Sequence, residues 1–411
     1  MMKTFCQATI VLVLSWLLGL CALYLSYSVE SASIEHNLER SSKVFEKEGT
    51  YPVSNKFTQV RLDNFTDALM LLISANSSPL SLKKVLLNPN ERLSLNGKTQ
   101  NPSQTLSLKF AKDSGKEEKK ISEWNYARYW HGYVVWLKPA LSVFDYKEIR
   151  KLLEITLLTI SSILILLLFK VHLTRYIPAF ILFLISLSPS AISQSLQFSS
   201  AIVISLLFSI VIIIASRKVC STKKYCFIFL LAGICTSYFD LLTCPILTLG
   251  LPATFFILCN KRFAVLETLK VSLYFAIAWG TGYFGMWFGK WLLATILTNQ
   301  NVFLEAYNQF IYRSSLDGVT GEHFSYLEMF MKNISQFNES SHNIFFIALL
   351  IFLILATIGA IKKNLFLLKN FIKYSFVMLL PFIWYSFASN HSFLHFWFTY
   401  RSVSLCHICA S

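Results

Sequence analysis

Long apolar runs separated by short polar stretches recur along most of the chain. An apolar run near 20 residues, folded as a helix, matches the hydrocarbon thickness of a bilayer. The pattern therefore predicts an all-α fold, a polytopic transmembrane helical bundle of about nine spans. The predicted spans are 8–28, 152–170, 177–193, 199–215, 225–241, 244–259, 264–288, 343–360 and 372–388.

Two long polar segments divide this pattern. The predicted parts are an N-terminal transmembrane anchor at 1–28, a loop domain at 29–150, a bundle at 151–388 that includes a polar loop at 290–342, and a C-terminal segment at 389–411. The first apolar run is similar to a signal peptide, but it is longer than a usual signal core and further spans follow it. We therefore expect it to be retained as an anchor.

The composition agrees with a membrane protein. Hydrophobic residues make up 55% of the 411 residues and charged residues only 14%, and the mean hydropathy is +0.53. Soluble domains carry about 25% charged residues.

The net charge of +15 is explained by loops rather than by a nucleic-acid surface. Basic residues gather in alternate loops, as in 217–224, 260–262 and 361–364, while the intervening loops 193–200 and 239–245 contain no Lys or Arg. The positive-inside bias then predicts a multi-pass plasma-membrane protein with a cytoplasmic N-terminus and outer segments at 29–150 and 290–342. Basic residues do not alternate with aromatic ones in a stripe, so no nucleic-acid partner is expected.

The last ten residues differ in character from the aromatic segment before them. An ending directly after "NHSFLHFWFTYR" (390–401) is typical of a truncated or frameshifted chain, and we expect an intact reading frame to continue differently.

Candidate chemistry begins with the stretch "RLDNFTDALML" (61–71). On a helix, Asp63 and Asp67 would share one face, since residues four apart are neighbours. A carboxylate in a partly desolvated cleft can act as a general base. Asp63 also fits a helix N-cap, in which case Asp67 alone would be reactive.

Three further polar clusters fall on the same predicted face. "RYWHGY" (128–133) supplies Arg128, Trp130, His131 and Tyr133, either as a platform for a sugar or lipid headgroup or as an interfacial aromatic belt. Asp240 ends the fifth predicted span, where capping or packing is the alternative role. His391, His395 and Arg401 follow the last predicted span.

No metal site is predicted. His391 and His395 are four residues apart, but no glutamate accompanies them as in a zinc-protease helix. Phosphate or hydroxyl contact is the favoured role for this cluster. The small residues at 280, 282, 285 and 289 predict close helix packing rather than a phosphate loop.

This layout resembles the GT-C superfamily of membrane glycosyltransferases, which have a first helix, a large outer loop with acidic residues, and many following spans. "FDYKEIRKLLEITLL" (144–158) is similar to their amphipathic entry into the second span. Locally, "LDNFTDALML", "RYWHGY", "DLLT" and "NHSFLHFWFTYR" resemble segments of an uncharacterised family of polytopic membrane proteins of Gram-positive bacteria.

The superfamily resemblance implies transfer of a sugar from a polyprenyl-phosphate donor to a cell-envelope glycan or protein acceptor on the outer face. It implies Asp63 or Asp67 as the base, with the other orienting the acceptor or a divalent ion. Cations would neutralise the departing phosphate; the candidates are Arg61, Arg128, His131, His391 and Arg401. This chain differs from many members in that its first candidate acidic residue lies later in the loop and its predicted spans are fewer.

Two other functions remain open. A transporter or flippase for a lipid-linked or polar substrate predicts mid-membrane charges and paired broken helices. A non-enzymatic membrane scaffold predicts no gathering of polar residues on one face.

Overall fold

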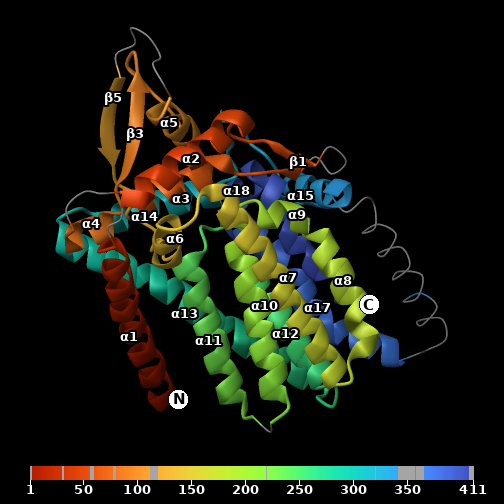
Figure 1. Ribbon diagram of the computed structural model, residues 1–411. Coiled ribbons are helices and arrows are strands. Elements are labelled where there is room, and N and C mark those ends of the chain that lie inside the picture. Colours follow the sequence, from red (N-terminus) through yellow and green to blue (C-terminus); the bar gives the residue numbers. More distant parts are fainter. Residues whose placement is uncertain are drawn as a thin grey trace.

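The computed structural model describes residues 2–29, 32–55, 60–76, 80–111, 119–218, 220–319, 321–340, 357 and 365–406. Most of these residues are helical. Figure 1 shows a bundle of long helices covered at one end by a layer of shorter helices and strands.

The bundle is built from apolar helices, most of them long. They are α1 (Met2–Tyr27), α7 (Tyr146–Lys170), α8 (Ile177–Ser186), α9 (Pro189–Ser193), α10 (Leu196–Ser216), α11 (Thr222–Phe239), α12 (Leu247–Cys259), α13 (Val265–Thr298) and α17 (Leu365–Phe387). A short 3-10 turn, η1 (Thr174–Tyr176), joins α7 to α8.

The predicted count of nine spans is wrong for the described part of the chain. Three helices there are long and apolar enough to cross a membrane: Cys6–Tyr27, Tyr146–Lys170 and Leu196–Ser216. These three coincide with the first, second and fourth predicted spans. The predicted span 343–360 lies almost entirely outside the described residues.

Local sequence explains why some predicted spans are shorter. The third is divided because Ser188 adopts a left-handed conformation (φ 59°) and Pro189 starts a new short helix, α9. The sixth begins only at Leu247 and forms a helix of 13 residues. Apolar composition alone does not reveal such breaks.

The second part of the molecule, which we call the polar layer, comprises residues 32–142. Its helices are α2 (Ala32–Glu48), α3 (Asn64–Ala75), α4 (Leu82–Leu87), α5 (Pro102–Lys109) and α6 (Val134–Leu141), and its strands are β1 (Val53–Asn55), β2 (Val60–Arg61), β3 (Asn90–Leu95), β4 (Lys98–Thr99) and β5 (Lys119–Trp124).

The strands correct the all-α prediction. β3 pairs antiparallel with both β4 and β5, and Asn90 faces Trp124 at one end of the longer ladder. The sheet packs on α5 through buried Leu93. The strands are short and largely polar, so their pattern gave no strand signal.

The remaining elements lie on the same side as the polar layer. They are α14 (Val302–Ser314), α15 (Tyr326–Ser340), α18 (Ser389–Leu394), α19 (Phe396–Thr399) and the 3-10 turn η2 (Tyr400–Val403). α14 is amphipathic and leaves Leu304, Tyr307 and Ile311 at least half exposed.

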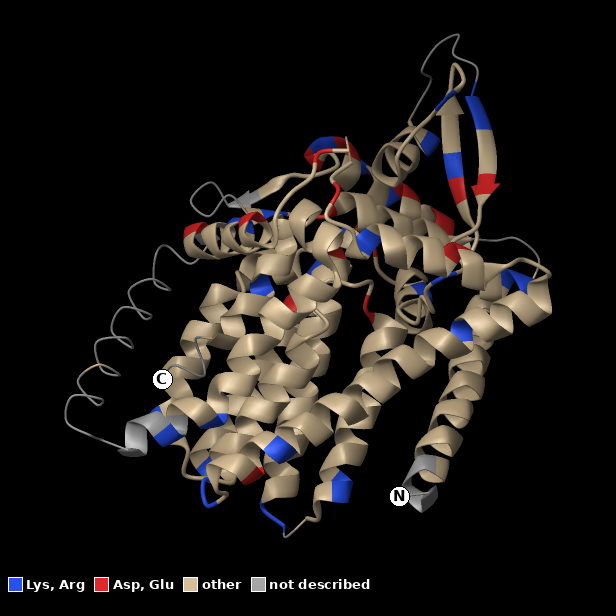
Figure 2. Ribbon diagram, turned by 180° about the vertical axis from the view of Figure 1, so that it is seen from behind, with Lys and Arg blue, Asp and Glu red and all other residues tan. Residues whose placement is uncertain are grey.

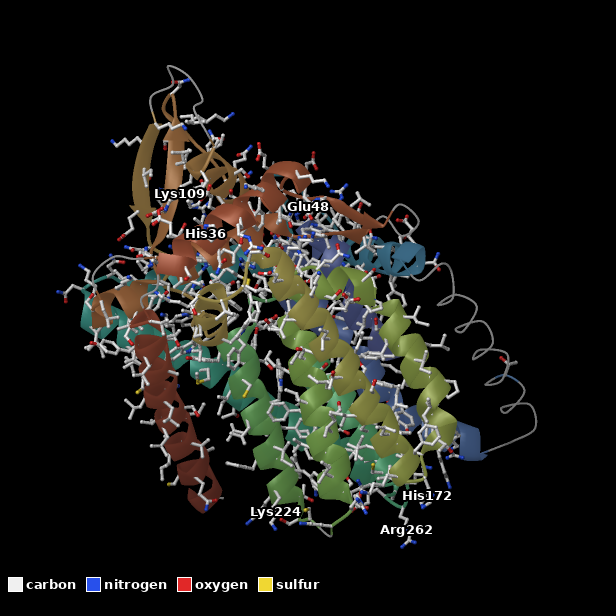
Figure 3. The ribbon with its side chains drawn as sticks, in the orientation of Figure 1. His36, Glu48, Lys109, His172, Lys224 and Arg262 are labelled. Atoms are coloured by element: carbon white, nitrogen blue, oxygen red, sulfur yellow. The ribbon has the colours of Figure 1, made fainter. Side chains whose placement is uncertain are left out.

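Charge separates the two ends of the molecule. Acidic residues gather in the polar layer, where they are mixed with Lys and Arg, whereas the opposite ends of the bundle helices, close to the N-terminus, carry mainly Lys and Arg (Figure 2). We call this opposite end the basic end; its loops are 170–175, 217–224 and 260–262. Figure 3 shows Glu48 in the polar layer and Lys224 and Arg262 at the basic end.

Glycines set the closest helix contacts. A Cβ at Gly282 of α13 would overlap the Leu230 carbonyl oxygen of α11, and a Cβ at Gly233 would overlap that of Trp279. α1 crosses α13 at Gly285, whose carbonyl accepts a 3.0 Å hydrogen bond from Trp16 Nε1. The predicted close packing is thus confirmed at 282, 285 and 289, but not at 280, where space is open.

This difference gives a matched pair of variants. Gly282→Ala should lower the thermal unfolding temperature in detergent, because overpacking costs roughly 1–3 kcal/mol. Gly280→Ala should leave it unchanged or raise it slightly, since Ala is a better helix former. Equal unfolding temperatures for the two variants would contradict the α11–α13 contact.

Candidate functional site

Asp67 lies at the junction of three segments. Each of its carboxylate oxygens accepts two hydrogen bonds. Oδ2 accepts from Tyr146 OH (2.5 Å) and Leu196 N (2.9 Å), and Oδ1 accepts from Ser195 Oγ (3.1 Å) and Gln197 N (3.0 Å). The carboxylate therefore caps the N-terminus of α10 from a neighbouring helix.

This geometry assigns Asp67 a structural task. A carboxylate has about four acceptor positions, and all are used here. Burial raises the pKa of Asp67, and the hydrogen bonds from Tyr146, Gln197 and Leu196 oppose that rise. A base needs an oxygen that can reach a substrate proton, which Asp67 does not offer in this arrangement.

An ion pair supports the same junction. Arg150 makes two hydrogen bonds to Glu48, at 2.7 and 2.9 Å, and a third to Tyr146 OH at 3.0 Å. Tyr146 thus receives a hydrogen bond from Arg150 while it donates one to Asp67. The pair links α2 to the first turns of α7, which fixes the polar layer on the bundle.

Asp63 is the N-cap of α3, as the capping alternative predicts. Its Oδ1 accepts from Thr66 N (3.0 Å) and its Oδ2 from Thr66 Oγ1 (2.8 Å). Burial raises the pKa of Asp63 to about 7. Arg61 is exposed and forms no ion pair with Asp63 among the described residues.

The segment 128–133 is packed in the core, so it does not form the open platform for a sugar or lipid headgroup that the sequence suggested. Trp130 is fully buried and its Nε1 donates to the Met286 carbonyl at 2.6 Å. His131 lies between Tyr133 OH (2.9 Å) and the Tyr126 carbonyl (2.8 Å). Burial lowers the pKa of His131 to about 3, so this ring is neutral, and Trp130, His131 and Tyr133 are not available to solvent.

Asp240 is placed differently from Asp67. It ends α11, and its Oδ2 accepts from Thr243 N at 2.9 Å, while its Oδ1 has no hydrogen-bond partner in the described part of the chain. Burial raises the pKa of Asp240 to about 7. A buried carboxylate with one unoccupied oxygen is unusual enough to mark a candidate site.

Hydrogen bonds connect Asp240 to Asp67 through two residues, Thr243 and Gln197. Gln197 donates its backbone N–H to Asp67, and its carbonyl accepts from Thr243 Oγ1 at 3.3 Å. The Asp240–Thr243 turn also forces Leu242 into a left-handed conformation (φ 67°), a cost that other contacts must offset.

His391 supplies one of those contacts. Its Nε2 donates to the Leu242 carbonyl at 2.9 Å, and its Nδ1 accepts from Arg313 Nη1 at 2.7 Å. Burial and the nearby Arg313 lower the pKa of His391 well below its usual value. His391 therefore holds Arg313 as a neutral acceptor, instead of carrying charge itself.

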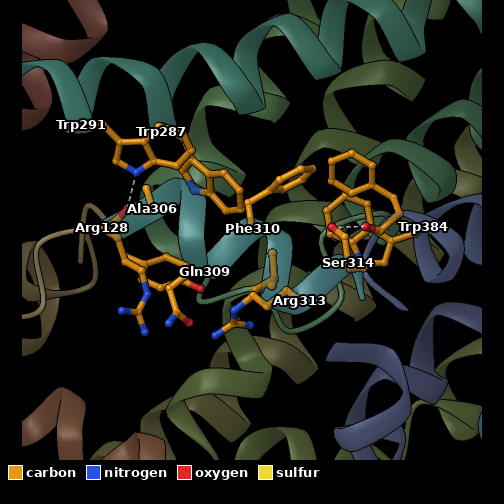
Figure 4. Close-up of a pocket in the computed structure, with 13 residues that line it drawn as sticks. Arg128, Trp287, Trp291, Ala306, Gln309, Phe310, Arg313, Ser314 and Trp384 are labelled. Carbon is orange, nitrogen blue, oxygen red and sulfur yellow. Dashed lines mark hydrogen bonds between the residues drawn. The ribbon is translucent and has the colours of Figure 1, made fainter. Parts of the chain in front are cut away.

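A narrow apolar cavity of about 50 Å³ opens beside this cluster. Its walls include Leu242, Trp287, Trp291, Phe310, Trp384 and Phe387. Arg128, Gln309 and Arg313 also border it, and Figure 4 shows these three side chains directed to the same side. Arg128 is held by Glu305 (2.8 Å) and by the ring of Tyr126, 4.5 Å from its guanidinium carbon.

The other predicted ligands lie apart from this cavity. Arg401 is fully buried, donates from Nε to the Leu187 carbonyl at 2.9 Å and stacks 4.3 Å from the Phe198 ring centre. His395 packs against His391, with ring centroids 4.8 Å apart, and burial lowers its pKa to about 4. Of the predicted site residues, Arg128 borders this cavity. His391 contacts two lining residues, Arg313 and Leu242, and Asp240 lies two positions before Leu242 in the chain. Asp67, His131 and Arg401 are not part of its lining.

Sequence reasoning missed Arg313 and the Trp287–Trp384 wall. Arg313 ends the aromatic stretch "VFLEAYNQFIYR" (302–313). An Arg at the end of an amphipathic, aromatic helix could have indicated a cation at the membrane interface. A second cavity of about 410 Å³, in the polar layer, was also missed. Lys84 and Lys138 border it and both donate to the Asn76 carbonyl, at 3.2 and 3.4 Å.

Metal coordination gains no support from the geometry. Within the described ranges, no three His, Cys, Asp or Glu side chains lie close enough together to hold an ion. Comparison with protein-family models, with curated proteins and with solved structures found no match to the chain. The described part of the chain is mostly helical, and three of its helices are long and apolar enough to cross a membrane.

Removing the two carboxylates should have unequal effects on stability. Asp67→Ala leaves several buried donors unsatisfied, each costing roughly 1–3 kcal/mol, so the protein should lose a large part of its stability. Asp63→Ala removes only a cap and should cost about 1 kcal/mol. Thermal unfolding in detergent measures both losses of stability. A smaller loss for Asp67→Ala than for Asp63→Ala would contradict the role of Asp67 as the cap of α10.

Stability should also depend on pH through Asp240. Its folded pKa of about 7 lies above that of an unfolded Asp, roughly 3.9. The native state therefore binds more protons, so this carboxyl makes the protein less stable as pH rises from about 4 to 7. Asp240→Asn should remove that component, which unfolding temperatures at several pH values would reveal as a smaller decline than in the wild type.

Proposed function

We propose that the protein is a membrane glycosyltransferase-like enzyme of the GT-C kind. It transfers a sugar from a polyprenyl-phosphate donor to a cell-envelope acceptor, with the polar layer outside and the N-terminus in the cytoplasm. The observation that carries this proposal is the cavity where Arg128 and Arg313 border an aromatic wall that also includes Leu242, a residue of the turn from Asp240 to Thr243.

The cavity suits one end of an amphipathic phosphate. The aromatic wall, with Trp287 and Trp384, would contact the isoprene unit next to the phosphate, and the volume of about 50 Å³ is too small for a sugar ring. The guanidinium groups of Arg128 and Arg313 would bind the phosphate, because planar donor forks match phosphate oxygens. The sugar would lie outside the crevice.

The exposed apolar face of α14 supports a ligand whose hydrocarbon end points into the membrane. α14 forms one wall of the cavity and exposes Leu304, Tyr307 and Ile311, a surface typical of a helix that lies in the lipid interface. α10 and α13 also carry exposed apolar residues, such as Leu207 and Ile277. We propose that α11, α12, α13 and α17 lie in the membrane beside the three long spans.

The proposed transfer uses one carboxylate and two cations. The acceptor hydroxyl oxygen forms a bond to the sugar's anomeric carbon as the bond from that carbon to the phosphate oxygen breaks. Polyprenyl phosphate leaves with the electron pair, and Arg128 and Arg313 stabilise the charge that develops on it. The hydroxyl proton passes to a carboxylate. We assign this role to Asp240, because its Oδ1 accepts no hydrogen bond from any described residue, whereas both oxygens of Asp63 and Asp67 do. That oxygen is buried, so the proposed transfer requires the Asp240–Thr243 turn to open toward the acceptor.

Polyprenyl phosphate binding tests the ligand. The purified protein in lipid nanodiscs should show altered tryptophan fluorescence on titration with undecaprenyl phosphate, since Trp287, Trp291 and Trp384 line the cavity. Arg313→Gln should weaken binding about tenfold or more, because a hydrogen bond to a charged group contributes roughly 1.5–3 kcal/mol. Arg175→Gln, at the basic end, serves as the control and should bind like the wild type.

The reaction itself is tested with the same variants. Release of polyprenyl phosphate from a labelled polyprenyl-phosphate sugar, with envelope extract as acceptor, should fall strongly in Asp240→Asn while lipid binding persists. Loss in Asp63→Asn instead would move the base to Asp63, since Asn preserves the cap. Lipid binding without release by the wild type, but with movement of the lipid across the bilayer, would favour a flippase.

A further inference from the structure

A larger cavity lies at the basic end, remote from the site described above. It has a volume of about 810 Å³ and opens between the ends of α7, α10 and α12. Lys170, His172, Arg217, Lys261 and Arg262 border it, and none of the residues described along it is acidic. Figure 3 shows His172 and Arg262 near each other at this end, with Lys224 further along it.

The position of the cavity relative to a membrane follows from two helices. α7 ends at Lys170 and α10 at Ser216, and both helices are long and apolar enough to cross a bilayer. Residues directly after such spans lie at the depth of lipid headgroups. The cavity is therefore within reach of the headgroups of one leaflet.

The helix end at Lys170 is well defined. Leu173 N donates to the Leu168 carbonyl (2.9 Å) and His172 N to the Phe169 carbonyl (3.1 Å), while His172 has φ 58°. These two hydrogen bonds form a Schellman motif, which satisfies the last carbonyl groups of the helix. It fixes Lys170 and His172 at the rim of the cavity.

The cations at this rim lack acidic neighbours. Lys170, Arg217, Lys261 and Arg262 form no ion pair with any described residue. Lys261 and a fifth cation, Arg175, lie against the ring of Tyr176, at 5.0 and 4.7 Å. The described part of the cavity rim therefore carries several positive charges and no negative one, which favours an anionic ligand.

The floor of the cavity is apolar. Val171 and Phe263 are partly exposed there, and the buried side chains of Ile213, Leu258 and Leu173 also border it. A ligand that matches both the cations at the rim and the apolar surface below them carries negative charge at one end and hydrocarbon at the other. Volumes of about 300–1,000 Å³ are usual for small-molecule sites.

We propose that this cavity binds an anionic phospholipid of the leaflet at the basic end. The headgroup phosphate is held by Lys170, Arg217, Lys261 and Arg262, and the upper part of an acyl chain lies against Val171 and Phe263. Basic pockets between spanning helices are suited to such headgroups, because each nearby cation contributes roughly 1 kcal/mol. The site is independent of the proposed glycosyltransfer, since it lies at the opposite end of the bundle.

Lipid titration of the purified full-length protein tests the proposal. Phosphatidylglycerol, phosphatidylcholine and inorganic phosphate are each added in neutral detergent, and the thermal unfolding temperature and the lipid adducts in native mass spectrometry are recorded. We expect phosphatidylglycerol to raise the unfolding temperature and to form a retained adduct. Phosphatidylcholine and inorganic phosphate should do neither.

A matched pair of double variants locates the site. Arg217→Gln with Lys261→Gln should weaken phosphatidylglycerol binding about tenfold or more, from roughly 1 kcal/mol for each cation. Lys223→Gln with Lys224→Gln removes the same charge from the same end, outside the cavity lining, and should bind within about twofold of the wild type. Arg217→Lys with Lys261→Arg keeps the charges and should retain binding.

Three results would overturn the proposal. Equal weakening in both glutamine variants would mean general attraction to a basic surface. Equal stabilisation by inorganic phosphate would mean a site for a soluble anion. Unchanged binding in Arg217→Gln with Lys261→Gln, judged by native mass spectrometry even if this variant unfolds at a lower temperature, would place the lipid elsewhere.

Discussion

The structure depends on the capping of α10 by the carboxylate of Asp67. The N-terminus of a helix carries unsatisfied N–H groups and a partial positive charge, and here that terminus is buried beneath the polar layer. Asp67 satisfies two of these groups and also binds Tyr146 OH. Since α3, α7 and α10 meet at this carboxylate, it fixes where the polar layer sits on the bundle.

The candidate site follows from the same contact. Gln197, held by Asp67, accepts a hydrogen bond from the Asp240–Thr243 turn. That turn presents Leu242 to His391, and His391 in turn orients Arg313 at the cavity. A series of hydrogen bonds thus runs from the cap of α10 to Arg313, which borders the apolar cavity. Displacement of Asp67 would therefore change the position of Arg313 at the cavity.

Particular residues show how much of this the sequence could predict. Runs of apolar residues located α1, α7 and α10, because length and hydropathy suffice for long uninterrupted helices. The glycines at 282, 285 and 289 predicted close packing, because a missing side chain has few other uses in a helix. Asp63 was correctly considered as a cap, because its spacing to Thr66 is a local property.

What the sequence could not predict depends on distant contacts. The four donors to Asp67 come from positions 79 to 130 residues away along the chain. The local sequence therefore does not distinguish a reactive carboxylate from one that caps a distant helix. The same holds for "RYWHGY", whose rings are buried because Trp130 finds the Met286 carbonyl. Arg313 and Arg128 meet at one cavity only because α14 folds back over α13.

A cryo-electron microscopy map of the protein in nanodiscs with undecaprenyl phosphate tests the central claim most directly. The account predicts phosphate density against Arg128 and Arg313, a chain along Trp287 and Trp384, and Asp67 still bound to the N-terminus of α10. Phosphate density against Asp63 and Asp67, with the Asp67 carboxylate withdrawn from Leu196 and Gln197, would contradict it.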